Sequence, residues 1–137
     1  MKEILKDIDR VLKDYPLLKH VMDKNIIKVI GDIELVHPIV GKFDHYSVEI
    51  TFTKSYPKGF PIVIETSEKI PRSGSRHVNP NNTLCLAVEQ EERRISRNGI
   101  TFKYFLEKVL IPHLSRETYR SINGSYSDGE YEHGDEG

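Results

Sequence analysis

Cysteine is almost absent from this sequence, and its scarcity excludes several classes of small protein. Only one of the 137 residues is a cysteine, Cys85, so neither an internal disulfide framework nor a cysteine-rich zinc module can form. No run of about 18 apolar residues occurs, which predicts no membrane-spanning helix. The first eight residues place acids within the apolar stripe, so we expect no signal peptide and a cytoplasmic location.

An excess of charge of one sign is also lacking. The 20 Lys and Arg residues face 21 Asp and Glu residues, and a net charge of −1 argues against a protein that coats nucleic acid. The charge is unevenly distributed, because five acids and neither Lys nor Arg follow Arg120. We assign residues 1–120 to one domain and residues 121–137 to an acidic, Gly-rich segment that could fold back near the site.

Two motifs that would indicate a cofactor are missing as well. Gly31, Gly41 and Gly74 stand alone, so no glycine-rich phosphate loop precedes a helix and no nucleotide cofactor is expected. The six histidines show neither HxxH nor HExxH spacing, and one cysteine makes a structural zinc site improbable. The sequence therefore predicts neither a cofactor nor a metal.

The apolar residues near the start of the chain change from helical to extended spacing. Apolar side chains recur every three or four residues from Ile4 to Leu12, which predicts an amphipathic helix. Pro16 interrupts this pattern, so the helix either ends near Asp14 or resumes after a break through Val21.

Four short apolar runs then predict four strands, namely Ile26–Ile30, Ile33–Val36, Tyr46–Thr53 and Ile62–Glu65. Gly31-Asp32 is interpreted as the turn between the first two runs, and the short connections favour an antiparallel meander. Later, Thr101 is a candidate N-cap for a helix that Pro112 should end or kink. The predicted class is α+β, with an N-terminal helix, a four-stranded meander, an active-site loop and a helix packed on the sheet.

Residues 67–83 form a long stretch in which Pro, Gly, Ser and Asn dominate. Loops longer than about 12–15 residues are uncommon in compact domains and are usually functional or disordered. This one leads directly into Cys85, which lies in the apolar run of residues 84–88. Cys85 is therefore either a buried core cysteine or a nucleophile mounted where a polar loop meets a rigid segment. Because several acids follow it, the sequence favours a modest nucleophile that faces an already activated ester.

Polar side chains that precede Cys85 could assist it. His77 either fixes the loop backbone by hydrogen bonds or pairs with the thiol, as in a Cys-His hydrolase. Asn79, Asn81 and Asn82 either form turns or supply an amide that donates to an oxyanion. The basic cluster at residues 93–97 is interpreted as a solvated loop or helix face rather than a site for an acidic partner.

The order of these elements resembles the ubiquitin-conjugating enzyme family over roughly residues 1–115. The resemblance is carried by the helix, the meander, Tyr56-Pro57 with Pro61, the His-x-Asn of residues 77–79 and the Thr-Leu-Cys-Leu of residues 83–86. His-Val-Asn-Pro replaces the eukaryotic His-Pro-Asn motif, Asn82 stands where Gly is common, and no Trp follows the cysteine. These departures, and the late Gly-Glu-x-x-His-Gly of residues 129–134, are similar to a bacterial branch of the fold.

The resemblance implies that Cys85 holds the C-terminal carboxyl of a protein as a thioester and passes it to an amine. It implies that His77 orders the loop, that Asn79 matches the oxyanion-stabilising residue, and that His133 joins the site if the C-terminal segment folds back. Bacterial members occur in antiphage (CBASS-type) operons. The expected protein substrate is therefore a nucleotidyltransferase similar to cyclic GMP–AMP synthase, or a ubiquitin-like protein. A separate activating enzyme is a further candidate partner, whereas nucleic acid and membranes are not expected partners.

Two other functions fit the same residues. A non-catalytic module of the same fold would only bind its partner, and it predicts that Cys85→Ala leaves its function intact. A small cysteine hydrolase would require the imidazole of His77 or His133 to touch the sulfur. The positions of the thiol and of these imidazoles therefore distinguish the alternatives.

Overall fold

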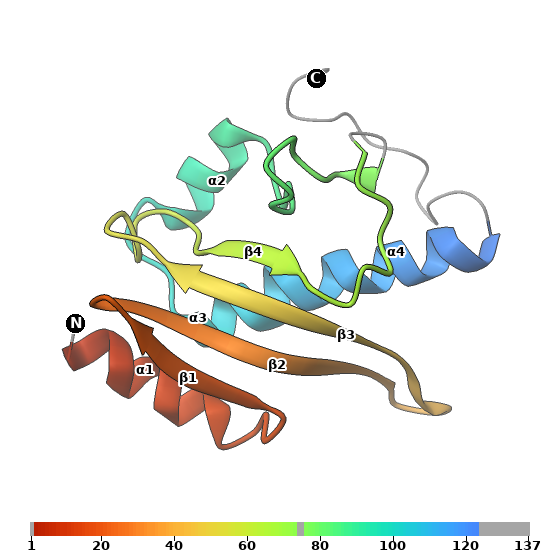
Figure 1. Cartoon of the computed structure of the whole chain (residues 1–137), viewed down its shortest axis with the longest axis horizontal. Coiled ribbons are helices and arrows are strands. Elements are labelled where there is room, and N and C mark those ends of the chain that lie inside the picture. Colours follow the sequence, from red (N-terminus) through yellow and green to blue (C-terminus); the bar gives the residue numbers. More distant parts are fainter. Residues whose placement is uncertain (1, 74–75, 124–137) are drawn as a thin grey trace.

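The computed structural model describes residues 2–73 and 76–123, in which helices pack on a four-stranded sheet (Figure 1). Helix α1 (Lys2–Leu12) is followed by strands β1 (Leu18–Asp23), β2 (Ile26–His37), β3 (Gly41–Phe52) and β4 (Ile62–Glu65). The strands are antiparallel and lie in the order β1-β2-β3-β4. After a long connection come α2 (Glu89–Ser96), α3 (Phe102–Tyr104), the π-helical segment η2 (Phe105–Leu110) and α4 (Ile111–Asn123).

This arrangement confirms the predicted α+β class, with its N-terminal helix, four-stranded antiparallel sheet and C-terminal helices on the sheet. Within the described residues, none of the helices is both long enough and apolar enough to cross a membrane. Helix α1 ends at Leu12, so the predicted end near Asp14 is correct within two residues and the predicted continuation through Val21 is wrong.

The strands themselves differ from the prediction at two places. The predicted turn at Gly31-Asp32 is wrong, because both residues lie inside β2, which runs unbroken through the first two predicted strands. The fourth strand of the sheet is β1, which is not predicted because its apolar residues fit the helical spacing that precedes them. Lys24 and Asn25 join β1 to β2 with positive φ angles of 50° and 68°, a two-residue turn whose twist matches that of the paired strands.

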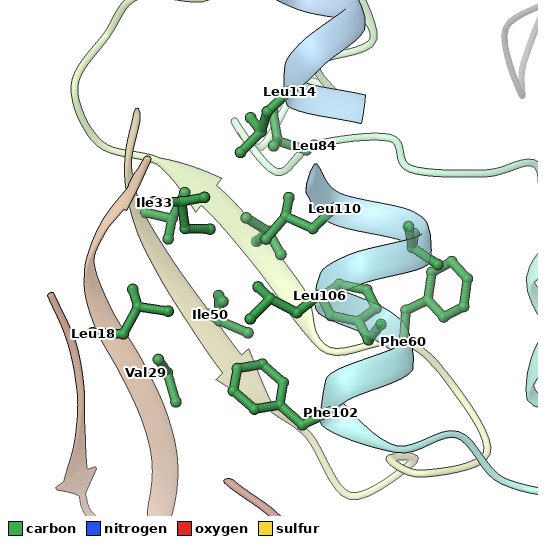
Figure 2. Close-up of a cluster of buried hydrophobic side chains, with 14 of the residues drawn as sticks. Leu18, Val29, Ile33, Ile50, Phe60, Leu84, Phe102, Leu106, Leu110 and Leu114 are labelled. Atoms are coloured by element: carbon green, nitrogen blue, oxygen red, sulfur yellow. The ribbon is translucent and has the colours of Figure 1, made fainter. Parts of the chain in front are cut away.

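The core lies between the sheet and the continuous helical segment that begins at α3. Figure 2 shows that every fourth residue of this segment points toward the sheet, and these side chains are fully buried: Phe102, Leu106, Leu110 and Leu114. Fully buried side chains of β2 and β3 face them, among them Val29, Ile33 and Ile50. Each such side chain contributes about 1.5–3 kcal/mol when it is buried, so this row of contacts fixes the helical segment on the sheet.

The start of this helical segment is as predicted, whereas the predicted end of the helix at Pro112 is wrong. Thr101 Oγ1 accepts a hydrogen bond from the Tyr104 amide at 3.1 Å, which confirms Thr101 as an N-cap. Pro112 does not end the helix, because it lies in the first turn of α4. In η2 just before it, the Ile111 amide bonds to the Leu106 carbonyl five residues back. The hydrogen-bond register therefore changes at the point where the proline lacks an N–H.

Gly31 of β2 lies very close to the backbone of Leu17, the residue just before β1. We therefore expect Gly31→Ala to destabilise the protein. A Cβ at this position would lie 2.0 Å from the Leu17 carbonyl oxygen, and φ is +137°. The substitution should lower the free energy of unfolding by at least about 2 kcal/mol, because it adds an overlap with backbone to a strained φ. The measurement is urea unfolding of both proteins.

Gly41→Ala is the matched control for this prediction. Gly41 also has a positive φ, +82°, but a Cβ there would meet no atom within 4 Å. Only the conformational strain remains, so the expected loss is about 1 kcal/mol. Equal losses in the two variants would contradict the close approach at Gly31.

Candidate active site

Cys85 lies at the end of a small hairpin that the long connection forms beside β4. Val78 and Leu84 form an antiparallel bridge, and the Leu84 amide donates to the Val63 carbonyl at 2.8 Å, which attaches the hairpin to β4. The Cys85 amide donates to the His77 carbonyl at 2.7 Å. Leu84 points into the core (Figure 2), whereas Cys85 is only half-buried. The backbone of Cys85 is therefore fixed, and its partial burial weighs against a core cysteine.

A pocket of about 300 Å³ lies beside the thiol. Three segments form its walls: the β3–β4 connection with the start of β4, the hairpin with the residues that follow Cys85, and α2. The lining side chains include Phe60, Ile62, Asn79, Leu86 and Glu92. Ile62 is 42% exposed, so an apolar surface continues outward from the thiol. The pocket combines a thiol, an amide and a carboxylate at the surface, where a bulky acyl donor can reach them.

Asn79 shares this pocket with Cys85, and its side chain is held in place. The Asn79 amide donates to Thr83 Oγ1 at 3.1 Å, and Thr83 Oγ1 in turn donates to Asn81 Oδ1 at 2.6 Å. A side-chain amide carries two N–H donors, so the bond to Thr83 engages one of them. The structure thus brings Asn79 and Cys85 together, as an oxyanion-stabilising role requires, and it gives Asn81 a turn-forming role.

The His77 imidazole is directed away from the pocket. The residue is only 2% exposed, its Nδ1 lies 3.7 Å from Glu117 Oε2, and its ring stands edge-on to His113 with ring centroids 6.0 Å apart. His77 is not among the described residues that line the pocket. His77 contacts Cys85 through its backbone carbonyl instead. His133, the other predicted histidine of the site, lies outside the described residues.

Glu92 is a residue of the pocket that the sequence analysis does not single out. Its Oε2 accepts a hydrogen bond from the Phe60 amide at 3.0 Å, which joins α2 to the β3–β4 connection. The other charges of α2 pair along the helix, Arg93 with Glu89 and Arg94 with Glu91. Helical spacing carries a signal for Glu92, because it lies four residues before the fully buried Ser96 and therefore on the inward face.

A buried carboxylate holds the start of the long connection. Glu65, the last residue of β4, is fully buried, and its Oε1 accepts hydrogen bonds from the amides of Lys69 at 3.1 Å and Ile70 at 3.0 Å. Ser67 Oγ also donates to this carboxylate. Because a carboxylate is buried only when donors satisfy it, these bonds close residues 65–70 into a defined turn.

His113 lies beneath this connection as a neutral imidazole. It is fully buried, and neither ring nitrogen has a hydrogen-bond partner among the described residues. Burial lowers its pKa from 6.5 to about 4. The Glu117 carboxylate opposes this shift, whereas His77 and Arg116 add to it.

We expect His113 to make the protein less stable in acid. Its pKa is about 4 in the folded protein, and we take the ordinary value of 6.5 for the unfolded chain. Between these two pH values the unfolded chain therefore binds a proton at His113 that the folded protein does not bind. Stability is therefore lost as the pH falls from 6.5 toward 4, by about 2 kcal/mol at pH 5. In His113→Leu this loss should vanish. Urea unfolding at pH 7 and pH 5 measures it, and a wild-type–variant difference that is the same at both pH values would contradict the assignment.

Comparisons with known proteins identify no family for this chain. No family model, no curated protein and no solved structure matches it. In residues 2–73 and 76–123, no group of three or more His, Cys, Asp or Glu side chains is arranged to hold a metal ion. The resemblance to ubiquitin-conjugating enzymes therefore stays a prediction.

Proposed function

We propose that this chain is a ubiquitin-conjugating-like transferase that carries a protein's C-terminal carboxyl as a thioester on Cys85 and passes it to an acceptor amine. The observation that carries the proposal is the half-buried Cys85 thiol beside a pocket that it shares with the Asn79 amide. The order of elements supports it: a helix, a four-stranded antiparallel sheet, a cysteine-bearing connection and C-terminal helices. The resemblance of the sequence to the ubiquitin-conjugating fold lies in this same order of elements.

Loading of the enzyme is an exchange between two thioesters. The sulfur of Cys85 attacks the carbonyl carbon of an activated protein C-terminus, a new C–S bond forms, and the bond to the donor's sulfur breaks. The proton of the Cys85 thiol ends on the departing thiolate. One thioester replaces another, so the step is nearly isoenergetic and a modest nucleophile is sufficient.

Transfer to the acceptor then consumes the thioester. A neutral amine attacks the carbonyl carbon, the carbonyl oxygen becomes an oxyanion, and the intermediate collapses to an amide as the C–S bond breaks. The proton lost by the amine neutralises the departing Cys85 thiolate. The second N–H of the Asn79 amide would donate to the oxyanion, a contribution of order 3 kcal/mol when it is well aligned.

The partners follow from the same resemblance. The donor is a nucleotidyltransferase similar to cyclic GMP–AMP synthase or a ubiquitin-like protein, a separate activating enzyme supplies its activated C-terminus, and the setting is bacterial antiphage defence. The position of the His77 imidazole weighs against the alternative of a cysteine hydrolase, because that ring faces Glu117 and His113. A binding module without activity is an outcome of the first test below.

The first test uses a peptide with a C-terminal glycine thioester of mercaptoethanesulfonate as the acyl donor. Mass spectrometry should show one acyl adduct that dithiothreitol reverses and that Cys85→Ala lacks. Free lysine should then discharge the wild-type adduct at least about tenfold faster than it discharges the glutathione thioester of the same peptide, because the site orients the reaction. An adduct that persists in Cys85→Ala, or a discharge no faster than that of glutathione, would refute the transferase and leave the binding module.

The second test addresses Asn79 with the same donor. Asn79→Ala should slow the discharge to lysine by about 10²-fold, because the oxyanion loses a donor, while Cys85 still forms the adduct. Asn82→Gly is the matched control from the same turn, where φ is +70° and glycine adopts this conformation readily. If both variants discharge at the wild-type rate, Asn79 has no part in the transfer step.

A further inference from the structure

A second fully buried carboxylate, Glu117 of α4, holds residues 76 and 77 of the long connection. Its Oε1 accepts a hydrogen bond from Arg76 Nε at 2.9 Å, and its Oε2 lies 3.7 Å from His77 Nδ1. The Arg76 side chain is only 13% exposed and also donates to Ser121 Oγ at 3.0 Å, one turn further along α4. Two consecutive residues of the connection are thus attached to one helix.

Stability alone does not account for this ion pair. A buried ion pair is often no more stabilising than apolar side chains of similar volume, because both charges must leave water. What the pair supplies is a defined geometry, because the flat guanidinium of Arg76 binds a carboxylate in few orientations. The pair therefore fixes where the backbone of residues 76 and 77 lies.

That backbone is in a conformation that needs to be held. His77 has a φ of +59°, which a residue with a Cβ seldom adopts. Such conformations persist only where the surrounding structure determines them. Here the imidazole is buried against Glu117 and His113, and the residue before it is bound to Glu117.

The conformation of His77 determines the position of Cys85 through one hydrogen bond. The His77 carbonyl accepts from the Cys85 amide at 2.7 Å, so a change of backbone angle at His77 would turn this carbonyl away and release Cys85. Asn79 follows two residues later and would move with it. We propose that Glu117 is a positioning residue, which holds Arg76 and His77 so that Cys85 and Asn79 line the same pocket.

This inference deepens the proposed function and rests on it for its meaning, since Cys85 is taken as the reacting group. Its test measures the position of Cys85 directly, by amide hydrogen exchange in the full chain, and needs no acyl donor. A failed thioester assay and a failed positioning test are therefore separate results.

The principal variant is Glu117→Leu. It should raise the exchange rate of the Cys85 amide, relative to that of Val29 in the central strand β2, by at least about tenfold. The Val29 amide reports global opening, so the ratio isolates local opening at the hairpin. Glu117→Gln keeps an acceptor for Arg76, so its exchange ratio should stay closer to that of the wild type.

Two further variants separate positioning from simple stabilisation. Val109→Ala, a substitution at a buried residue of η2, should lower global stability and speed exchange at Val29 without raising the ratio of Cys85 to Val29 exchange. The double variant Arg76→Met with Glu117→Leu removes both charges, so it should recover stability without recovering slow exchange at Cys85.

Either of two results would overturn the proposal. The first is a ratio of Cys85 to Val29 exchange that stays at the wild-type value in Glu117→Leu. The second is a double variant that recovers both the stability and the slow exchange of the wild type. If Glu117→Leu does not fold, two variants supply the same comparison: the double variant, which leaves neither charge of the pair in the core, and Glu117→Gln, which keeps an acceptor for Arg76.

Discussion

Two buried carboxylates, Glu65 and Glu117, bind the connection that leads from β4 to Cys85. Glu65 gathers the backbone amides of residues 69 and 70 at the end of β4, and Glu117 binds Arg76 from the facing helix. A carboxylate enters the interior only when donors satisfy it, so folding the core and ordering the connection are one process. The thiol of Cys85 is mounted on the segment that these two anchors support.

The position of Glu117 follows from the packing of the helical segment that carries it. Its buried row, from Phe102 to Leu114, fixes the segment against β2 and β3, and Glu117 lies three residues beyond this row. The π-helical η2 inserts a wider turn partway along, so the residues of α4 are rotated relative to those of an unbroken α-helix. This rotation helps to determine which face of α4 meets the connection. The hydrophobic core therefore sets the position of Glu117, which contacts residues 76 and 77.

Sequence patterns predict the parts of this fold that rest on local rules. The strict alternation of β3, the Thr101 cap and the long connection before Cys85 are all visible in the sequence. Strand β1 escapes because its six residues alternate poorly and its turn, Lys24-Asn25, lacks glycine. Gly31 resembles a turn residue in the sequence, but glycine is needed there because the Leu17 carbonyl leaves no room for a Cβ. That contact is a tertiary one, which local sequence patterns do not reveal.

The candidate site is predictable in its residues but not in its support. Cys85 and Asn79 can be chosen from the motif, whereas Glu117 pairs with a residue 41 positions away and resembles any charged helix residue. The His77 ring lies against Glu117 and His113, whereas a general base would have to lie beside the thiol. This arrangement is consistent with the proposed chemistry. A thioester that waits for an amine must resist water, and an imidazole aimed at its carbonyl would activate water. The burial of the His77 ring against Glu117 thus supports transfer over hydrolysis, because the ring that orders the hairpin is kept from acting as a base beside the thioester.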